Sequence, residues 1–170
     1  MSRITDFYLG KLKHPRNENI DQIWLYTDSQ LEYIHDYIQW LFPLTERSNA
    51  VPDSPTLSNE DIERFDESDE LKHRLRKSFL LLLKFYGFSM RYDPEPVIET
   101  TDLFETRARN WLTSNNHNHL RITRILRSLT LLGLSKEATE FFAALQRVYL
   151  RNPDKIGSYT YEYWSRAIKT

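Results

Sequence analysis

The segment from 69 to 86 constrains the fold most strongly, because its apolar residues recur at the spacing of an α-helix. Additional leucines near its end widen the apolar stripe almost to a full circle, a pattern typical of a helix that is buried on most sides. Gly87 follows at the position where a left-handed C-terminal cap is needed. We therefore expect a central helix over residues 69–86. Its main stripe consists of Leu71, Leu75, Phe79, Leu82 and Tyr86.

Two capping boxes mark the starts of further helices in the N-terminal half. Ser29 and Glu32 have the spacing of such a box at the start of a helix over residues 30–42, and Ser58 and Asp61 repeat it before the next helix. In each box the first side chain accepts from a backbone amide of the first turn, and the second side chain returns the contact. Both segments are therefore predicted to be helical.

The C-terminal half shows the same helical spacing. Sustained alternation of apolar and polar residues, which would predict strands, is not convincing anywhere in the sequence. No internal repeat or long linker divides the chain. We therefore predict an all-α fold, a single compact domain over residues 1–170 with about six or seven helices and no significant sheet. The helices expected in this half cover residues 101–112, 119–132, 135–151 and 159–169.

Composition excludes several classes of protein. The sequence contains no cysteine, which removes disulfide bonds, thiolate metal sites and a cysteine nucleophile. Its longest apolar run, from Phe79 to Leu83, is far shorter than the ~20 residues of a membrane-spanning helix. The N-terminus lacks the apolar segment of a secretory signal. We therefore expect a cytoplasmic protein without a membrane span.

Charge is distributed unevenly along the chain. Residues 1–100 contain 12 Lys and Arg against 18 Asp and Glu, whereas residues 101–170 contain 11 against 6. Such an asymmetry indicates either an anionic partner for one face or two halves with complementary fields. Nucleic acid is a less favoured partner, because the pI of about 6.5 is low for a dedicated nucleic-acid binder. The basic residues that would serve it are Arg107, Arg109, Arg121, Arg124, Arg127, Arg147 and Arg151.

A first candidate ligand site lies on the helix expected after the Ser29 cap. Helical spacing places Tyr37 and Trp40 on a face with Tyr33, beside the apolar stripe of that helix. Aromatic residues on such a face usually belong to the core. The alternative is a groove for an aromatic-bearing ligand, with His35 and Gln39 supplying polar contacts at its edge.

A second candidate site lies at the start of the helix expected over 119–132. An arginine in the first turn of a helix gains nothing from the helix dipole, so Arg121 and Arg124 should each have a specific partner. One alternative is internal: the guanidinium groups brace carboxylates or carbonyls of the protein. The other is an anion site, in which Asn118, the two arginines and the free amides of the helix start bind a phosphate or carboxylate.

The sequence contains no recognisable catalytic constellation. It lacks Gly-rich phosphate loops and the Gly-x-Ser-x-Gly elbow. Glu32 and His35 form a Glu-x-x-His pair, but the di-iron bundles that use such pairs need further Glu-bearing helices. His117 and His119 lack a third ligand. We therefore expect no catalytic residue, no metal and no cofactor.

Three segments resemble the conserved domain of the opioid growth factor receptor family: Tyr37-Ile38-Gln39-Trp40-Leu41-Phe42-Pro43-Leu44, Phe85-Tyr86-Gly87 and Leu120-Arg121-Ile122-Thr123-Arg124-Ile125-Leu126. The resemblance implies an all-helical domain. Some animal members are described as receptors for the pentapeptide Met-enkephalin, associated with the nucleus and linked to growth restraint. The present sequence ends near residue 170, without their long C-terminal extension of repeats, and we expect a short, stand-alone member.

The sequence thus predicts a non-enzymatic module that binds a peptide or a protein. We place its site where the segment of Trp40 would approach the helix start from Asn118 to Arg124. A binder of, or an enzyme acting on, a phosphorylated or carboxylated small molecule is the alternative, with Arg121 and Arg124 holding the anion. Nucleic-acid binding through the basic half is a lesser alternative.

Overall fold

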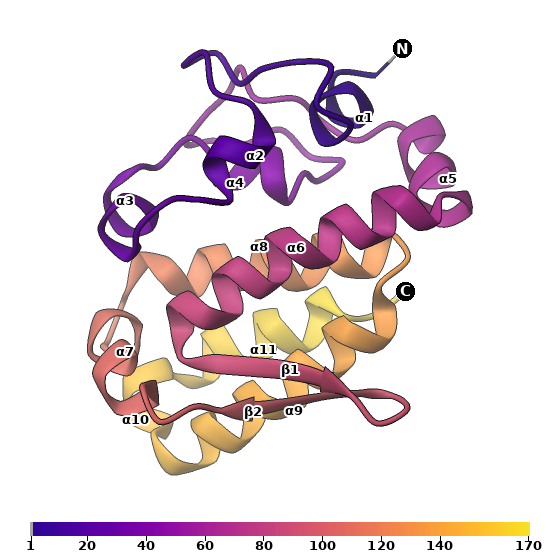
Figure 1. Ribbon diagram of the computed structural model, residues 1–170. Helices are drawn as coiled ribbons and strands as arrows, with labels where there is room; N and C mark the ends of the chain where they lie inside the picture. Colours follow the sequence, from indigo (N-terminus) through magenta and orange to yellow (C-terminus); the bar gives the residue numbers. More distant parts are fainter. Residues whose placement is uncertain (1) are drawn as a thin grey trace. The chain divides into compact units, whose positions relative to one another are not determined.

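The computed structural model describes residues 2–170 and has the helical class expected from the sequence (Figure 1). Eleven helices and one two-stranded sheet lie within this range. The chain divides into two compact units: the first ends at Leu81 and the second begins at Leu82. None of the helices between residues 2 and 170 combines the length and the apolarity that a membrane span requires.

The first unit is built from short helices around an aromatic core. The ring of Phe7 lies 5.1 Å from that of Trp40, and the ring of Tyr8 lies 5.4 Å from that of Phe65, both in edge-to-face geometry. Such pairs add about 1 kcal/mol each beyond the burial of their area. The helices are α1 (Arg3–Tyr8), α2 (Ile20–Ile23), α3 (Asp28–Tyr33), α4 (Ile38–Leu41), α5 (Asn59–Glu67) and α6 (Asp69–Tyr86), which continues into the second unit.

The single helix predicted over residues 30–42 is wrong, because the chain is helical only in α3 and α4. The capping box is also shifted: Thr27 and Gln30 form it. Two tertiary contacts explain the break. The hydroxyl group of Tyr37 donates to the carbonyl oxygen of Leu31 (2.8 Å), and Nε2 of His14 lies 2.8 Å from the carbonyl oxygen of Asp36. Side chains therefore satisfy backbone carbonyls that a continuous helix would have paired internally.

The predictions for α5 and α6 are confirmed. Ser58 and Asp61 form the capping box at the start of α5, and α6 has the predicted bounds. Gly87 follows with a φ of +95°, a backbone conformation that favours glycine. A Cβ atom at this position would lie 2.8 Å from the Cα atom of Phe104, so close packing also requires glycine here.

The second unit packs helices against a hairpin. α8 packs against α9 and α11, and β2 lies along α9. Two tryptophans, Trp111 and Trp164, are completely or almost completely buried in this unit. Its elements are β1 (Phe88–Tyr92), β2 (Pro96–Thr100), α7 (Phe104–Trp111), α8 (His117–Leu131), α9 (Ser135–Arg151), α10 (Pro153–Ile156) and α11 (Ser158–Ala167).

The sequence did not predict the hairpin, which pairs β1 and β2 antiparallel with Phe88 opposite Thr100 and Tyr92 opposite Pro96. Its strands are short, and Pro94 and Pro96 favour a loop when the sequence is considered alone. The outer edge of β2 is stabilised by α9: the amide of Ile98 donates to Oε1 of Glu140 (3.4 Å), and the carbonyl oxygen of Ile98 accepts from Nη2 of Arg147 (3.1 Å). The hairpin therefore depends on contacts that no local pattern records.

The helices after the hairpin follow the prediction closely, with corrections at their ends. α8 begins two residues earlier than predicted, because the side chain of Asn116 caps the amide of Asn118 (2.9 Å). α9 has the predicted bounds. Pro153 follows the end of α9 and is the first residue of α10. Proline is well suited to this position, because the amides of a first helical turn have no partner within the helix.

Candidate functional site

The structure separates the residues predicted for the aromatic site. Tyr37 is completely buried, Trp40 and Gln39 are buried, and His35 is exposed. Tyr33 is 76% exposed, so it shares no face with Tyr37 and Trp40, because the helix that would have aligned them is broken. Tyr37 and Trp40 are thus core residues of the first unit.

Trp40 is held by three neighbours within the first unit. Its ring lies 5.1 Å from the ring of Phe7 and 5.4 Å from the imidazole of His14. The guanidinium of Arg3 lies over the indole, 5.1 Å from its centroid, in the geometry of a cation–π contact. The packing of Trp40 is therefore explained by residues of its own unit.

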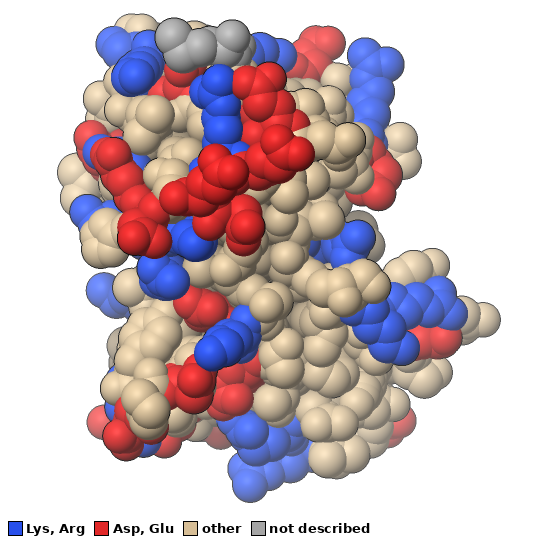
Figure 2. Space-filling model, turned by 90° about the vertical axis from the view of Figure 1, so that its right-hand side faces the viewer, with Lys and Arg blue, Asp and Glu red and all other residues tan. Residues whose placement is uncertain are grey.

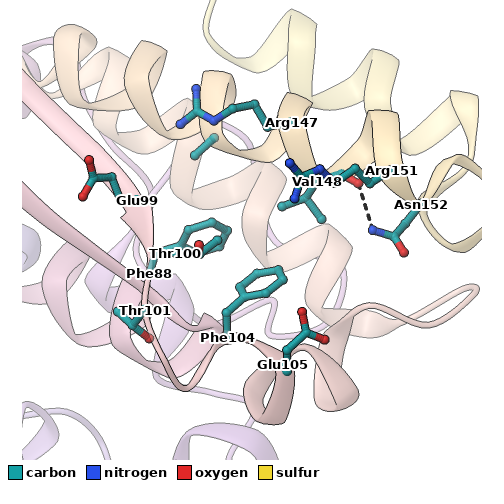
Figure 3. Close-up of a pocket in the computed structure, with 11 residues that line it drawn as sticks. Phe88, Glu99, Thr100, Thr101, Phe104, Glu105, Arg147, Val148, Arg151 and Asn152 are labelled. Atoms are coloured by element: carbon teal, nitrogen blue, oxygen red, sulfur yellow. Dashed lines mark hydrogen bonds between the residues drawn. The ribbon is translucent and has the colours of Figure 1, made fainter.

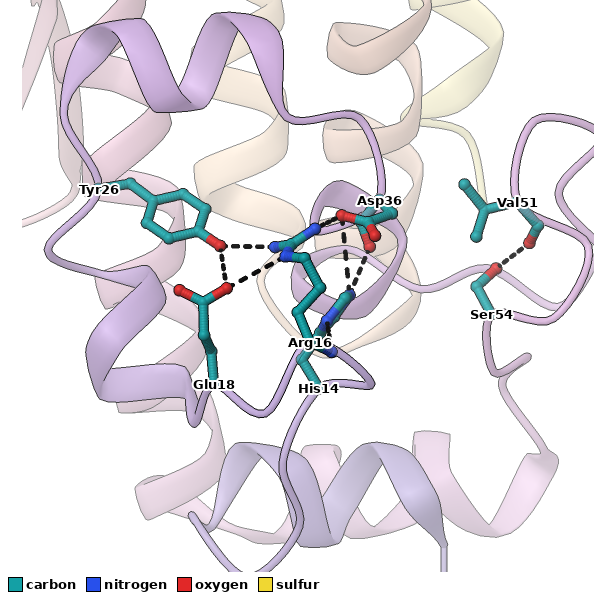
Figure 4. Close-up of polar contacts among 7 residues, drawn as sticks. All are labelled: His14, Arg16, Glu18, Tyr26, Asp36, Val51 and Ser54. Carbon is teal, nitrogen blue, oxygen red and sulfur yellow. Dashed lines mark hydrogen bonds and ion pairs between the residues drawn. The ribbon is translucent and has the colours of Figure 1, made fainter.

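His14 is the anchor of a polar cluster in the first unit (Figure 4). Its Nδ1 accepts from the amide of Arg16 (3.0 Å), so Nε2 carries the hydrogen and donates to the carbonyl oxygen of Asp36 (2.8 Å). Burial, together with the positive charge of Arg16, lowers the pKa of His14 to about 4. The neutral imidazole therefore fixes the segment between α3 and α4.

The side chain of Arg16 completes this cluster. It donates to Oε1 of Glu18 (3.1 Å) and to the hydroxyl group of Tyr26 (2.5 Å), and it forms an ion pair with Asp36 (Figure 4). Desolvation raises the pKa of Tyr26 to about 12, helped by its hydrogen bond to Glu18. Because its groups are engaged with one another, the cluster serves the fold of the first unit.

Of the second predicted site, the structure brings Asn118 and Arg121 together on α8. Asn118 is completely buried and Arg121 is 6% exposed. The Oδ1 atom of Asn118 accepts from the hydroxyl group of Tyr86 (3.2 Å) and from Nη1 of Arg121 (3.5 Å). Arg124 is half-buried one turn further along. A site shared by this helix start and the segment of Trp40 stays a prediction.

His119 does not form a metal site with His117. Its Nε2 lies 2.7 Å from the carbonyl oxygen of Trp111, and its ring lies 5.8 Å from the ring of Trp164. Burial lowers the pKa of His119. His117 is exposed. Between residues 2 and 170 no group of three or more metal-ligating side chains is found.

The second unit carries a surface groove that the sequence did not reveal (Figure 3). Two neighbouring pockets of about 380 Å³ each have Phe104, Glu105 and Asn152 in common, and together we call them the α7–α9 groove. The aromatic rings of Phe88 and Phe104 pack at 5.5 Å on its floor. The remaining lining residues are Glu99, Thr100, Thr101, Ala108, Arg109, Leu112, Thr113, Ala144, Arg147, Val148, Arg151 and Lys155.

Cations dominate the rim of the α7–α9 groove. Arg147 is held by the carbonyl oxygen of Ile98. The side chains of Arg109, Arg151 and Lys155 form no ion pair or hydrogen bond with the described residues. The rim's acidic residues are Glu99, which pairs with Arg91 outside the groove (3.4 Å), and Glu105. The basic character of the C-terminal half was the one sequence signal for this site.

Acidic residues gather on a face of the first unit instead. Figure 2 shows them over α5 and the first turn of α6. Some of these acidic residues form ion pairs within their helix, as Glu60 does with Arg64 (2.7 Å). The exposed acidic residues of this stretch are Glu60, Glu63, Asp66, Glu67, Asp69 and Glu70. The charge asymmetry of the sequence therefore corresponds to two distinct surfaces, one on each unit.

Known proteins resemble this chain over three quarters or more of its length. The opioid growth factor receptor of Rattus norvegicus is 40% identical over 133 residues, which is 78% of this chain and 22% of that protein. The receptor of the same name in Homo sapiens is 36% identical over 148 residues, or 85% and 21%. Opioid growth factor receptor-like protein 1 of Xenopus tropicalis is 34% identical over 131 residues, or 75% and 25%.

This chain thus spans about a fifth to a quarter of the length of these relatives. No solved structure matches it. A family model described as the opioid growth factor receptor (OGFr) conserved region matches residues 3–169. The resemblance noted in the sequence is therefore confirmed, and the chain belongs to the opioid growth factor receptor family.

Proposed function

We propose that this chain is a non-enzymatic binding module and that its α7–α9 groove holds a short peptide or a peptide segment of a protein. The observation that carries the proposal is the groove itself, which combines an aromatic floor with a charged rim. Binding sites commonly have this composition, because apolar contacts supply affinity while a few polar groups fix the orientation of the ligand.

A peptide fits the chemistry of the groove because its backbone carries donors and acceptors. The side-chain amide of Asn152 donates to the carbonyl oxygen of Val148 (3.1 Å), which leaves its own oxygen available as an acceptor. The hydroxyl group of Thr100 lies on the opposite wall (Figure 3). An apolar side chain of the peptide would rest on the half-buried ring of Phe104.

The names of related proteins support a receptor-like role. The relatives in Rattus norvegicus and Homo sapiens are named opioid growth factor receptors. A pentapeptide such as Met-enkephalin has a free carboxylate and a free amine, which carry opposite charges at neutral pH. Arg151 would bind the carboxylate, and Glu105 would bind the amine.

Chemical-shift mapping with unlabelled Met-enkephalin and the isotopically labelled chain tests the proposal. We expect saturable shifts at Thr100, Phe104 and Asn152. The variant Arg151→Ala should weaken binding about fivefold, whereas Arg166→Ala, an exposed arginine on α11 outside the groove, should not. The absence of any saturable shift would contradict peptide binding.

The same spectra separate this proposal from the site predicted on the sequence. Saturable shifts at Trp40 and Arg121, with the groove amides unchanged, would favour that site. Inorganic phosphate serves as the comparison ligand, because it tests whether the arginines recognise a small anion alone. Phosphate shifts at Arg121 and Arg124 without peptide shifts would support the small-anion alternative.

A further inference from the structure

The charge on the rim of the α7–α9 groove identifies the kind of peptide that it takes. Four cationic side chains line the groove, on α7, α9 and α10: Arg109, Arg147, Arg151 and Lys155. Elsewhere in the second unit Lys136 pairs with Glu95 (3.1 Å) and Arg166 pairs with Glu162, whereas three of the groove cations form no ion pair with the described residues. The groove therefore concentrates positive charge that the second unit does not neutralise.

We infer that the groove selects acidic peptides, an inference that rests on the function proposed above. Arg147 and Arg151 lie four residues apart on α9, so both project from the same face of the helix, where two like charges repel. A carboxylate between them relieves this repulsion and accepts charge-assisted hydrogen bonds. Arg147 is already oriented by its bond to the carbonyl oxygen of Ile98, so less side-chain entropy is lost on binding.

The second pocket of the groove repeats this chemistry. Arg109 and Lys155 line that pocket, and the aromatic ring of Phe104 lines both pockets. An extended peptide would thus place one acidic side chain near Arg151, an apolar side chain over Phe104 and a second acidic side chain near Lys155. This order of acidic, apolar and acidic residues is the pattern that the groove recognises.

A peptide fits the groove better than a nucleic acid does. Glu99 and Glu105 lie among the cations, and a phosphate backbone, which carries a negative charge at every nucleotide, would bring charges against them, whereas a peptide can place uncharged residues there. Single-stranded nucleic acids also need exposed aromatic faces on which bases stack. Phe88 is 2% exposed and Phe104 is half-buried, so the floor offers packing for an aliphatic or aromatic side chain but little stacking surface.

The test uses acetylated and amidated heptapeptides that share a central phenylalanine and differ only in the charge of their flanking residues, which are glutamate, glutamine or lysine. Isothermal titration calorimetry of the full chain should give a Kd for the glutamate peptide at least about tenfold lower than for the glutamine peptide. The lysine peptide should not bind. Added salt should raise the Kd of the glutamate peptide and leave the Kd of the glutamine peptide unchanged.

Two matched variants locate the effect. Arg151→Glu should raise the Kd of the glutamate peptide at least about tenfold. Arg166→Glu makes the same charge change on α11, outside the groove, and should leave that Kd within about twofold. Both arginines are exposed, and circular dichroism checks that each variant is folded.

Each outcome decides a separate point. Equal affinities for the glutamate and glutamine peptides would overturn acid selectivity and leave the proposed peptide binding intact. Failure of all three peptides to bind would overturn the inference, while the proposed peptide binding is decided separately by the spectra with Met-enkephalin, whose termini are free. A single-stranded oligonucleotide that bound more tightly than the glutamate peptide, and lost affinity in Arg151→Glu, would overturn the inference in favour of nucleic acid.

Discussion

The hydroxyl group of Tyr8 lies 2.8 Å from the hydroxyl group of Ser78, and this contact joins α1 to α6 across most of the sequence of the first unit. The Tyr8 hydroxyl also donates to the carbonyl oxygen of Leu41 (2.6 Å), and Nε1 of Trp24 donates to Ser78 (2.9 Å). Four segments therefore meet in one buried hydrogen-bonded network.

Replacement of Tyr8 by phenylalanine should destabilise the protein by about 1–3 kcal/mol. The ring would stay packed against Phe65, but the carbonyl of Leu41 would lose its buried donor. Urea unfolding followed by fluorescence measures the change. Tyr159→Phe, which removes a hydroxyl from a side chain that is 81% exposed, should change the free energy of unfolding little. Equal effects of the two variants would contradict a structural role for the network.

The stability of the protein should fall as the pH drops from about 6.5 to about 4, because the pKa of His14 is about 4 in the fold and 6.5 as the ordinary value. The unfolded chain binds a proton in this window, whereas the buried imidazole does not. The stability that depends on the neutral imidazole of His14 is fully present above pH 6.5, and the difference between the two pKa values sets its upper bound at about 3 kcal/mol. Urea midpoints measured at several pH values across this window report it.

The matched control for this pH dependence is His73, which is exposed on α6. His14→Gln should flatten the dependence between pH 6.5 and 4, while His73→Gln should leave it unchanged. A His14→Gln protein with the same slope as the parent would show that other groups cause the dependence.

Gly87→Ala should destabilise the protein by about 3 kcal/mol, because it combines a positive φ with a clash against the backbone of Phe104. Gly157 has a similar φ of +84°, but an added Cβ would meet nothing within 4 Å. Gly157→Ala should therefore carry the backbone strain alone, about 1–3 kcal/mol, and cost less than Gly87→Ala. Thermal unfolding distinguishes the two variants. Similar decreases in Tm would contradict a clash between a Cβ atom at position 87 and the backbone of Phe104.

Arg107→Ala should destabilise the second unit by about 1–3 kcal/mol. Nε of Arg107 donates to the carbonyl oxygen of Phe85 (2.7 Å), in the last turn of α6, and its guanidinium lies 4.8 Å from the centroid of the Phe85 ring. The carbonyls of a last helical turn have no partners within the helix. Arg109→Ala, an exposed change on the same helix, should leave unfolding by guanidinium chloride unchanged; a comparable loss there would contradict the assignment.

The sequence predicted α6 and α9 with their observed bounds, because each has one apolar stripe and clear end signals. It failed between α3 and α4, where Tyr37 and His14 satisfy backbone carbonyls from a distance. It also failed at the hairpin, where α9 supplies the partners of Ile98. Periodicity describes the helical or strand tendency of a segment by itself, and these two features arise from side-chain contacts that periodicity does not record.

The candidate groove was even less accessible to sequence reasoning. Its residues come from β1, β2, α7, α9 and α10, and none of these elements carries a motif of its own. The excess of basic residues in the C-terminal half indicated either an anionic partner or a complementary acidic half, and it gave no location for a site. The sequence alone does not distinguish Arg121 from Arg151. In the structure Arg121 is buried on α8 beside Asn118, whereas Arg151 is exposed at the groove.

The contacts of Ile98 with Glu140 and Arg147 also affect how copies of the protein meet one another. A two-stranded hairpin ordinarily offers rows of backbone donors and acceptors that recruit a strand from another molecule. On β2 the groups of Ile98 are occupied, and Pro96 has no amide hydrogen to offer. Sheet growth through this edge is therefore blocked, which protects concentrated solutions of the protein from one common route to fibrous aggregates.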